Sequence, residues 1–367
     1  METIPKTARA AVLTVFGAPL EIRTFPIGAP EPGGALVKVE AAGVCGTDVH
    51  LWKGQLPIPR PLILGHEAVG VIAALGEGVT SDWRDAPLAV GDRVTWSAGL
   101  LCGHCYYCAL KRQPTRCVNR KAYGISFGCD APPHLRGSYA EYVHLLPRTA
   151  IFKLGDLPAE PVIGAGCALV TALHGIERAG IGWGDTVVVQ GSGPVGLSAV
   201  AVARTAGAAR VIVIGGPRHR LDLAQAFGAD LVIDIDEVKD PAQRVARILR
   251  ATDGHGADAV IECVGAPVVV AEGFEMCREG GKYLVLGHYA DGGPTSLNPH
   301  VITRKQLTVY GSWASEPRHM ASALDFLARR PDLPFARLAA ERFPLEAAFD
   351  ALQTSARFAS AKSVIAP

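Results

Sequence analysis

Thiol, imidazole and carboxylate side chains gather in one early segment, GVCGTDVHLWKGQLPIPRPLILGHE, at residues 43–67. The thiol is Cys45, and the adjacent imidazole and carboxylate are His66 and Glu67. Zinc binds thiolate, imidazole and carboxylate ligands, and a catalytic zinc keeps one position open for water or substrate. Because Cys45 and His66 are far apart in sequence, only the fold can bring them together. The segment predicts a catalytic metal site, and a structural cysteine with a hydrogen-bonded core histidine is the alternative.

Four further cysteines follow within a short stretch. Cys102, Cys105 and Cys108 form two CxxC steps that share the middle residue, and Cys117 follows the polar stretch ALKRQPTR. This spacing is typical of a tetrahedral Cys₄ zinc site. Four thiolates leave no open position, so the predicted role is structural, with free loop cysteines as the alternative. His104 is not an expected ligand, because the thiols already satisfy the metal.

A glycine-rich turn, GSGPVG, follows the strand-like run TVVVQ and precedes a helical pattern. A GxGxxG motif between a strand and a helix is a dinucleotide fingerprint. Its first glycine allows a tight turn, its second lets a pyrophosphate approach the backbone, and its third lets helix and strand pack closely. The helix N-terminus adds amide donors and a favourable dipole for phosphate. The expected cofactor-binding residues are Gly191, Gly193, Pro194, Val195 and Gly196.

The end of the next strand, in VIVIGGPRHR, bears on the choice of cofactor. NAD sites place an acidic residue about 20 residues after the glycines, where it holds the ribose 2′-hydroxyl. Here Gly215 and Gly216 leave room for a 2′-phosphate, and Arg218, His219 and Arg220 are nearby cations. The sequence therefore favours NADP over NAD. Alternatively, these basic residues only begin a solvated helix, and NAD binds without an acidic clamp.

The elements that must position these residues fall into two kinds. The first third of the chain is rich in Gly and Pro with short β-type runs, which predicts a partly open β-barrel. From about residue 162, strands and helices alternate, which predicts a doubly wound parallel sheet with helices on both faces. Beyond residue 300 the pattern weakens. We expect domains at 1–160 and 161–300, with 301–367 returning to the first.

Composition narrows the function classes. A chain of 367 residues suggests two domains, and its net charge of +1 without long charged runs argues against nucleic acid or an anionic membrane as partners. We recognise neither a signal peptide nor an uninterrupted apolar stretch of about 18 residues, so no membrane span is expected. Nine cysteines, four of them crowded together, indicate metal binding in a cytoplasmic protein rather than a disulfide framework.

These motifs together resemble the zinc-dependent medium-chain dehydrogenase/reductase family, of the alcohol dehydrogenase type. The resemblance covers nearly the whole chain and rests on GVCGTDVH, GHEAVG, GDRV, the CxxCxxC run, GSYAEY and GSGPVG, in this order. It implies a GroES-like catalytic domain and a Rossmann domain. It also implies that an alcohol is oxidised to a carbonyl, or the reverse, with hydride passing to or from NAD(P). Family members form dimers and tetramers, so a homodimer or homotetramer is expected.

The resemblance also assigns roles to the residues of the metal site. Cys45 and His66 match two catalytic zinc ligands, and Glu67 matches a carboxylate that lies close to the metal and ligates it in some states. The family's third ligand is Cys in many members and Glu or Asp in polyol- and threonine-type members. Cys167 falls on that position, and Glu160 is the less well placed alternative.

Three residues between the ligands match the proton-handling part of the family's site. Thr47 matches the hydroxyl that bonds the substrate oxygen, His50 the far end of a proton relay, and Asp48 the partner that orients a ligand histidine. The chain departs from the pattern at two places. One extra residue lies between the third and fourth cysteines of the Cys₄ run, and Gly215 stands where an acid is usual.

The substrate class is less constrained. Secondary or cyclic alcohols are expected, and polyols come second because Cys167 departs from the polyol-type ligand. A lyase or epimerase that oxidises its substrate transiently and retains its cofactor is a further alternative. The loop 127–136 could shape the pocket entrance. Apolar residues that could line a pocket wall, or simply belong to the core, are Leu51, Trp52, Trp96 and Ala98.

Overall fold

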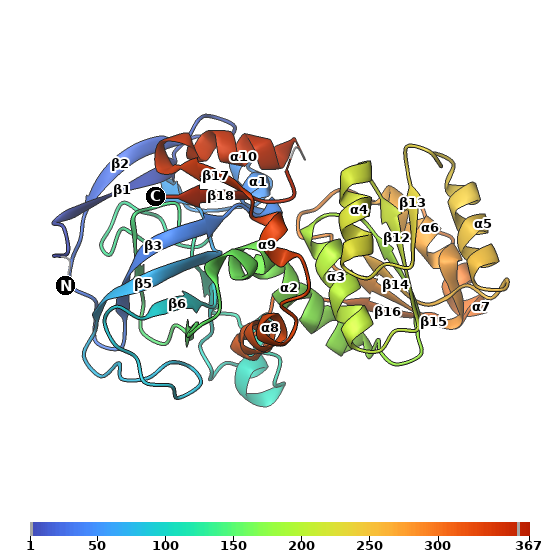
Figure 1. Ribbon diagram of the computed structural model, residues 1–367, viewed down its shortest axis with the longest axis horizontal. Coiled ribbons are helices and arrows are strands. Elements are labelled where there is room, and N and C mark those ends of the chain that lie inside the picture. The colour runs from blue at the N-terminus through green and yellow to red at the C-terminus, as the bar shows by residue number, and fades with distance from the viewer. Residues whose placement is uncertain (1–2, 358–359) are drawn as a thin grey trace. The chain divides into compact units, whose positions relative to one another are not determined.

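The computed structural model describes residues 3–357 and 360–367 (Figure 1). The chain divides into two compact units. The first unit comprises Met1–Cys167, Ser315–Arg329 and Phe335–Pro367, and the second comprises Ala168–Ala314 and Arg330–Pro334. Compared with the expected boundaries, residues 161–167 group with the first unit and residues 301–314 with the second. The latter stay there because strand β16 (Thr308–Gly311) pairs in parallel with β15 (Cys277–Val285).

Within the described residues, the first unit contains a smaller three-stranded sheet, a larger seven-stranded sheet and a separate two-stranded ladder. In the smaller sheet, β1 (Thr7–Leu13) pairs antiparallel with β2 (Glu21–Pro26) and β4 (Leu62–Ile63). The larger sheet runs in the order β10-β6-β5-β3-β18-β17, with β9 also paired to β3. Its strands are β3 (Ala35–Gly43), β5 (Ala68–Leu75), β6 (Arg93–Trp96), β9 (Tyr142–Leu145), β10 (Ile151–Lys153), β17 (Glu341–Pro344) and β18 (Ser363–Ala366).

The C-terminal segment completes the larger sheet. Strand β18 lies between β3 and β17, antiparallel to the first and parallel to the second (Figure 1). One apolar core joins both sheets and includes residues from the helix α10 (Ala348–Ala356). The other elements of this unit are α1 (Gly46–Trp52), β7 (Gly99–Leu100), η1 (Tyr106–Leu110), η2 (Pro114–Arg116), β8 (Lys121–Ala122), α8 (Pro317–Arg329), α9 (Phe335–Leu338) and η3 (Leu345–Ala347).

The second unit is a six-stranded parallel sheet in the order β13-β12-β11-β14-β15-β16, so the predicted doubly wound fold is confirmed. The strand order reverses between β11 and β14, and ligands of such sheets bind outside the carboxyl ends of the strands at this switch point. The remaining elements are β11 (Thr186–Gln190), α3 (Pro194–Thr205), β12 (Arg210–Gly215), α4 (Arg218–Ala226), β13 (Leu231–Asp234), α5 (Pro241–Ala251), β14 (Ala257–Glu262), α6 (Val268–Met276) and α7 (His300–Arg304).

Side chains alternate between the two faces of this sheet, as strand geometry requires. On one face, Val188, Ile212 and Val260 pack in a cluster with Ile248 of α5 and Phe274 of α6. The intervening strand residues are equally buried on the opposite face. Burial on both faces explains why these strands read as continuous apolar runs in the sequence.

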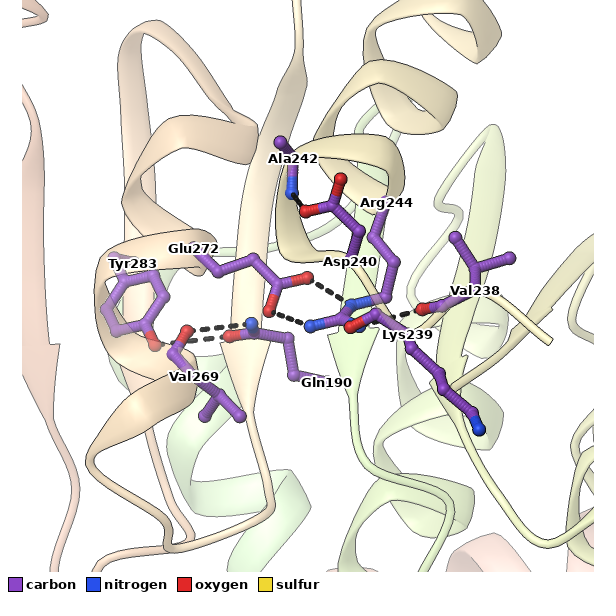
Figure 2. Close-up of polar contacts among 9 residues, drawn as sticks. All are labelled: Gln190, Val238, Lys239, Asp240, Ala242, Arg244, Val269, Glu272 and Tyr283. Carbon is purple, nitrogen blue, oxygen red and sulfur yellow. Dashed lines mark hydrogen bonds and ion pairs between the residues drawn. The ribbon is translucent and has the colours of Figure 1, made fainter. Parts of the chain in front are cut away.

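Polar groups inside the second unit tie its helices to the sheet (Figure 2). The Arg244 guanidinium of α5 donates to both oxygens of Glu272 on α6, over 2.6 and 2.8 Å. At the end of β11, the Gln190 amide donates to the Val269 carbonyl over 2.9 Å and accepts from the Tyr283 hydroxyl over 3.1 Å. The last residue of β11 is therefore fixed to both α6 and β15.

The helix α2 (Ala159–Ala179) is, within the described residues, the one helix long and apolar enough to cross a membrane by length and composition alone. Of its most apolar window, 61% is buried inside the protein. A core helix passes the same test, so this observation is weak evidence for a membrane span.

Asp258 of β14 gives a test of electrostatics in the second unit. Its carboxylate accepts the Thr186 backbone N–H over 2.7 Å and the Arg278 guanidinium over 2.6 Å. Partial burial raises the pKa of Asp258, but these two contacts outweigh it and hold the pKa below its ordinary value. A depressed pKa stabilises the fold above the unfolded-state pKa, and the contribution is lost as pH falls through the folded-state pKa.

We therefore expect Asp258→Asn to lower the free energy of unfolding by about 1 kcal/mol near neutral pH. The difference from wild type should shrink at an acidic pH below the ordinary pKa of aspartate, because the native carboxylate then begins to take up a proton. Urea unfolding at both pH values measures it. Asp222→Asn, which removes an exposed ion pair with Arg218, is the control with little expected effect. A destabilisation by Asp258→Asn that is equal at both pH values would contradict the electrostatic account.

Candidate active site

Helix α1 positions three of the predicted residues, because it begins directly after Cys45. The Asp48 carboxylate accepts the Cys45 backbone N–H over 2.9 Å, and the Asp48 N–H donates to the Cys45 carbonyl over 3.0 Å. These bonds close the first turn as a capping box does. They fix the Cys45 backbone at a helix N-terminus, where the exposed amides favour a thiolate.

Asp48 also faces the imidazole of His66. Its carboxylate is fully buried, accepts the Tyr139 hydroxyl over 3.1 Å, and lies 3.4 Å from the His66 Nδ1. Burial lowers the pKa of His66, but Asp48 and the Cys45 thiol outweigh it and hold the pKa well above its ordinary value. Because Nδ1 is turned toward Asp48, the other ring nitrogen is left to face Cys45. This is the carboxylate–histidine arrangement that orients metal-binding imidazoles.

The ligand atoms of Cys45, His66, Glu67 and Cys167 all lie within 4.8 Å of one another. The two sulfur atoms are 3.3 Å apart. The hydrogen bond from the Cys167 thiol lowers the pKa of Cys45 to about 6, while the same contact raises the pKa of Cys167 well above its ordinary value. The two sulfurs thus share a proton, and a zinc ion among them would allow both to ionise. Two thiols and an oriented imidazole fit a catalytic zinc with one position open.

The Glu67 carboxylate is held by two partners. Its Oε2 pairs with the Lys362 ammonium at 2.5 Å, and both side chains are almost entirely buried. Its Oε1 accepts the Cys167 backbone N–H over 2.8 Å. Burial raises the pKa of Glu67, but the positive charge of Lys362 outweighs it and lowers the pKa. Lys362 comes from the segment before β18, so the C-terminal part of the chain reaches the metal-binding cluster.

A break in helix α2 places Cys167. Gly166 adopts φ 47° and ψ −146°, a conformation that favours glycine. A Cβ atom on Gly166 would also lie 2.2 Å from the Lys362 ammonium and 2.4 Å from Glu67 Oε2. Glycine is therefore required beside the ion pair. Glu160, the alternative ligand, lies outside the cluster in the first turn of α2, where it pairs with Arg342 at 2.9 Å.

Thr47 and His50 lie three residues apart on α1 and are both half-buried. Residues at this spacing share one face of a helix. The His50 Nδ1 shares a hydrogen bond with the Gln55 side-chain oxygen at 2.5 Å. Because an amide oxygen only accepts, Gln55 favours the proton on Nδ1 and leaves the other nitrogen of His50 as an acceptor.

The glycine turn of the second unit is crowded except at its middle glycine. Gly191 has φ +107°, and a Cβ on Gly196 would lie 2.0 Å from the Gly191 carbonyl oxygen. A Cβ on Gly193, by contrast, would have no heavy atom within 4 Å. Helix α3 begins at the next residue, Pro194. The backbone is therefore open where a pyrophosphate would approach a helix N-terminus, which fits a dinucleotide.

The structure gives a reason for Gly215 at the end of β12. The Ser192 hydroxyl donates to the Gly216 carbonyl over 3.0 Å and accepts the Gly216 N–H over 3.1 Å. A Cβ on Gly215 would lie 2.5 Å from this hydroxyl, so an acidic side chain could not occupy the position without a shift. Of the two nearby arginines, Arg218 is exposed and pairs with Asp222, whereas Arg220 is buried.

Two family models match the chain. One described as "Alcohol dehydrogenase GroES-like domain" matches residues 31–156, and one described as "Zinc-binding dehydrogenase" matches residues 194–329. Among known proteins, 5-exo-hydroxycamphor dehydrogenase from Pseudomonas putida is 38% identical over 363 residues, which are 98% of this chain and 98% of that protein. The chain belongs to the zinc-binding dehydrogenase family. It is a zinc alcohol dehydrogenase of the medium-chain dehydrogenase/reductase type, with a GroES-like domain and a Rossmann sheet.

Solved structures agree with this assignment. An alcohol dehydrogenase from Thermotoga maritima superimposes with a TM-score of 0.94 at 36% identity, and the match covers 98% of this chain and 99% of that one. A protein described as a zinc-binding dehydrogenase from Sinorhizobium meliloti 1021, bound to NADP, superimposes with a TM-score of 0.85 at 30% identity. That match covers 99% of this chain and 100% of the other.

This zinc-binding dehydrogenase has a second cluster of possible metal ligands. The sulfur atoms of Cys102, Cys105, Cys108 and Cys117 lie within 4.8 Å of one another. Burial raises the pKa of Cys102, but N–H donors and polar neighbours outweigh it and lower the pKa to about 5. Burial and the Cys105 thiol raise the pKa of Cys108 to about 12. Thiols this close do not all ionise without a cation. The four sulfurs therefore fit a closed tetrahedral zinc, despite the extra residue between Cys108 and Cys117.

Some site residues of this dehydrogenase were not recognisable in the sequence. Lys362 lies 295 positions from Glu67 and belongs to no motif. Gly166 is one of many glycines, and its closeness to the ion pair of Lys362 with Glu67 is visible only in the structure. Tyr139, which bonds Asp48, does lie in the motif GSYAEY, so a signal for it was present.

The apolar residues that could have lined a pocket lie mostly in the core. Leu51 and Trp96 are buried in the main cluster of the first unit. Trp52 packs edge-on against Phe349 with ring centroids 5.8 Å apart and donates to a backbone carbonyl. Ala98 is half-buried. In the loop 127–136, the guanidinium of its last residue stacks on the ring of its first at 4.9 Å.

Proposed function

We propose that this dehydrogenase oxidises a secondary or cyclic alcohol to a ketone, or catalyses the reverse reaction, with NADP as the preferred cofactor. The observation that carries the proposal is the convergence of Cys45, His66 and Cys167 in front of the buried Asp48. Two thiols with an oriented imidazole are the ligands of an open zinc site rather than of a closed structural one.

The residues divide the chemistry among them. When bound, zinc supplies Lewis-acid polarisation of the alcohol oxygen, and the nicotinamide supplies the hydride acceptor. Cys45, His66 and Cys167 would hold the metal, and Asp48 would keep the His66 ring oriented. The Thr47 hydroxyl would accept a hydrogen bond from the substrate alcohol and take its proton. His50 would pass that proton to solvent, because an imidazole can both accept and release a proton.

His50→Ala is expected to lower kcat about tenfold near neutral pH, since a proton acceptor is lost from the relay. The loss should shrink as pH rises, because hydroxide then accepts the proton. The pH profile of kcat measures this. His300→Ala, which removes an exposed histidine of the second unit, is the matched control. A His50→Ala profile parallel to that of wild type would remove His50 from the proton pathway.

The preference for NADP is supported by the lack of an acid at Gly215 and by the exposed Arg218 at the start of α4. It is also supported by the NADP-bound relative from Sinorhizobium meliloti. Comparing kcat/KM for NADP and NAD, with Arg218→Ala as the diagnostic variant, tests it. We expect wild type to favour NADP and the variant to lose most of that preference. A wild type that favours NAD would mean that the basic residues belong only to the surface.

The secondary or cyclic substrate is supported by the relative named 5-exo-hydroxycamphor dehydrogenase and by Cys167, which departs from polyol-type ligands. Turnover of a panel of secondary, cyclic and polyol substrates, with zinc content measured on the same sample, tests it. Exclusive use of polyols would favour the polyol-type alternative. Tightly retained cofactor with no net oxidation, despite bound zinc, would instead favour an enzyme that oxidises its substrate transiently.

We also propose a homodimer or homotetramer, as the resemblance to the family implies, and a cytoplasmic location, which is supported by the free cysteines. Light scattering of the purified protein measures the oligomeric state. A monomeric mass at micromolar concentration would overturn that part of the proposal.

A further inference from the structure

Glu262 is a buried carboxylate at the switch point of the parallel sheet. It is the last residue of β14, and its exposed fraction is 0%. In the strand register it lies between Gln190 of β11 and Val285 of β15. An ionisable side chain in such a position is costly to bury unless its oxygens are hydrogen-bonded.

The partners of Glu262 are backbone groups of two separate loops. Its Oε1 accepts the N–H groups of Val264 and Gly265, each over 2.6 Å, in the loop after β14. Its Oε2 accepts the N–H of Gly287 over 3.1 Å, in the loop after β15, and lies 3.7 Å from the His288 Nε2. One side chain therefore joins the two loops at the carboxyl ends of adjacent strands.

The two loops are in direct contact around this carboxylate. A Cβ on Gly265 would lie 2.5 Å from the Gly287 carbonyl oxygen. A Cβ on Gly287 would lie 2.4 Å from the Gly265 nitrogen and 2.8 Å from Glu262 Oε1. Neither glycine could carry a side chain without moving the other loop. The loops thus lie at a close spacing that the Glu262 side chain bridges. The Glu262 backbone carbonyl also accepts the N–H groups of Leu286 and Gly287, over 2.9 and 3.1 Å, but only the carboxylate reaches the N–H groups of both loops.

The loop after β14 also borders the glycine turn. A Cβ on Gly191 would lie 3.1 Å from Val264 Cγ2 and 3.2 Å from the Cys263 backbone carbon. Val264 nevertheless keeps 48% of its surface exposed, so it presents an apolar surface beside the pyrophosphate-binding turn.

The direction of a bound dinucleotide follows from the sheet. The ribose next to the adenine is recognised at the end of the strand that follows the glycine turn, which here is β12. The pyrophosphate lies at the turn itself. The other half of the dinucleotide, which carries the nicotinamide, therefore extends across the switch point toward β14 and β15.

We propose that Glu262 is a positioning residue for the nicotinamide half of the cofactor. It holds the loops 263–265 and 286–288 as one rigid surface over which this half lies, without touching the reacting atoms itself. The inference rests on the proposed dinucleotide site at Gly191–Gly196. Glu262 would thus contribute by fixing the spacing of the two loops and would take no part in the hydride or proton transfer.

Glu262→Gln tests the proposal, because the amide keeps the shape but replaces one accepting oxygen with a donor that faces backbone N–H groups. Titration calorimetry would give Kd values for NADPH, or NADH if wild type prefers it, and for the adenosine fragment 2′,5′-ADP, or AMP. We expect the Kd of the whole dinucleotide to rise about tenfold, which corresponds to one lost charge-assisted contact. The Kd of the fragment should change by less than about twofold, because the fragment does not reach β14 and β15.

Glu272→Gln is the matched control, because it removes another buried carboxylate of the same unit, one that pairs with Arg244 and not with the two loops. We expect it to lower Tm without the selective loss of dinucleotide binding. If Glu262→Gln does not fold, Gly287→Ala decides, since its added methyl group forces the loops apart with the carboxylate intact.

The role of Glu262 is overturned if Glu262→Gln, or Gly287→Ala in its place, weakens binding of the fragment and of the dinucleotide equally. It is also overturned if that variant weakens binding of neither. A wild type that binds neither NADPH nor NADH overturns the proposed dinucleotide site, and this inference with it. The wild-type titration therefore separates failure of the proposed function from failure of the positioning role alone.

Discussion

Cys45→Ser is expected to lower kcat/KM about a thousandfold or more and to remove one zinc equivalent from the purified protein. The physical reason is the 3.3 Å contact between the sulfurs of Cys45 and Cys167, which makes Cys45 the readily ionised thiol of the cluster. A serine hydroxyl does not ionise in its place, so the metal loses a charged ligand. A zinc ion that acts as a Lewis acid stabilises the transition state by several kcal/mol, and each loss of about 1.36 kcal/mol lowers the rate about tenfold.

Metal content by plasma mass spectrometry and steady-state kinetics on the same sample measure this effect. His66→Ala should behave alike, since it removes the imidazole that Asp48 orients. Cys129→Ser is the matched control, because Cys129 is a buried cysteine of the same unit outside both cysteine clusters. Full zinc content and normal turnover in both Cys45→Ser and His66→Ala would show that the metal is held elsewhere.

Lys362→Met is expected to have the largest effect on stability, lowering the free energy of unfolding by about 3–5 kcal/mol. The ammonium of Lys362 and the carboxylate of Glu67 expose only 2% and 3% of their side chains. Removing the ammonium leaves a buried carboxylate that keeps, among the described residues, the backbone N–H of Cys167 as its hydrogen-bond donor. Neutralising the carboxylate as well, in the double variant Lys362→Met with Glu67→Gln, should recover part of the loss.

Urea unfolding of the metal-loaded protein measures the difference. Arg342→Met is the control, because it breaks the ion pair with Glu160 in the same unit where both side chains are about half exposed. Exposed pairs contribute about 0–1 kcal/mol, so this variant should unfold much as wild type does. If Lys362→Met were no less stable than Arg342→Met, Glu67 would have to find another partner or take up a proton.

The sequence patterns predicted the second unit more completely than the first. Its strands are buried on both faces and its helices are regular, so a local pattern identifies each element in turn. The strands β17 and β18 were not recognised, because each has only four residues and they join the larger sheet through the pairing of β18 with β3, from the first part of the chain. A different pairing, of β16 with β15, accounts for residues 301–314 lying in the second unit, where β16 extends the parallel sheet.

At the metal site, the residue types pointed to Cys45 and His66, because the ligand chemistry of zinc restricts the choice, and the family resemblance added Cys167. The structure places these three side chains close together. Lys362 was not predicted, because a single lysine before a short apolar strand resembles any surface residue. The sequence also explained only in part why glycine stands at position 215. Room for a 2′-phosphate was expected from the missing acid, whereas the close approach of the Ser192 hydroxyl is visible only in three dimensions.

The ion pair of Glu67 with Lys362 also determines when the metal site can be finished during biosynthesis. The two residues are separated by 295 positions. Ribosomes extend a chain by about 5–20 residues per second, so Glu67 waits roughly 15–60 s before its partner has even been made. During that interval the segment with Cys45 and His66 is exposed with its carboxylate unpaired. The site therefore reaches its final form only after residue 362 has been made, and a nascent chain stalled before it would present its thiols beside an unpaired Glu67 carboxylate.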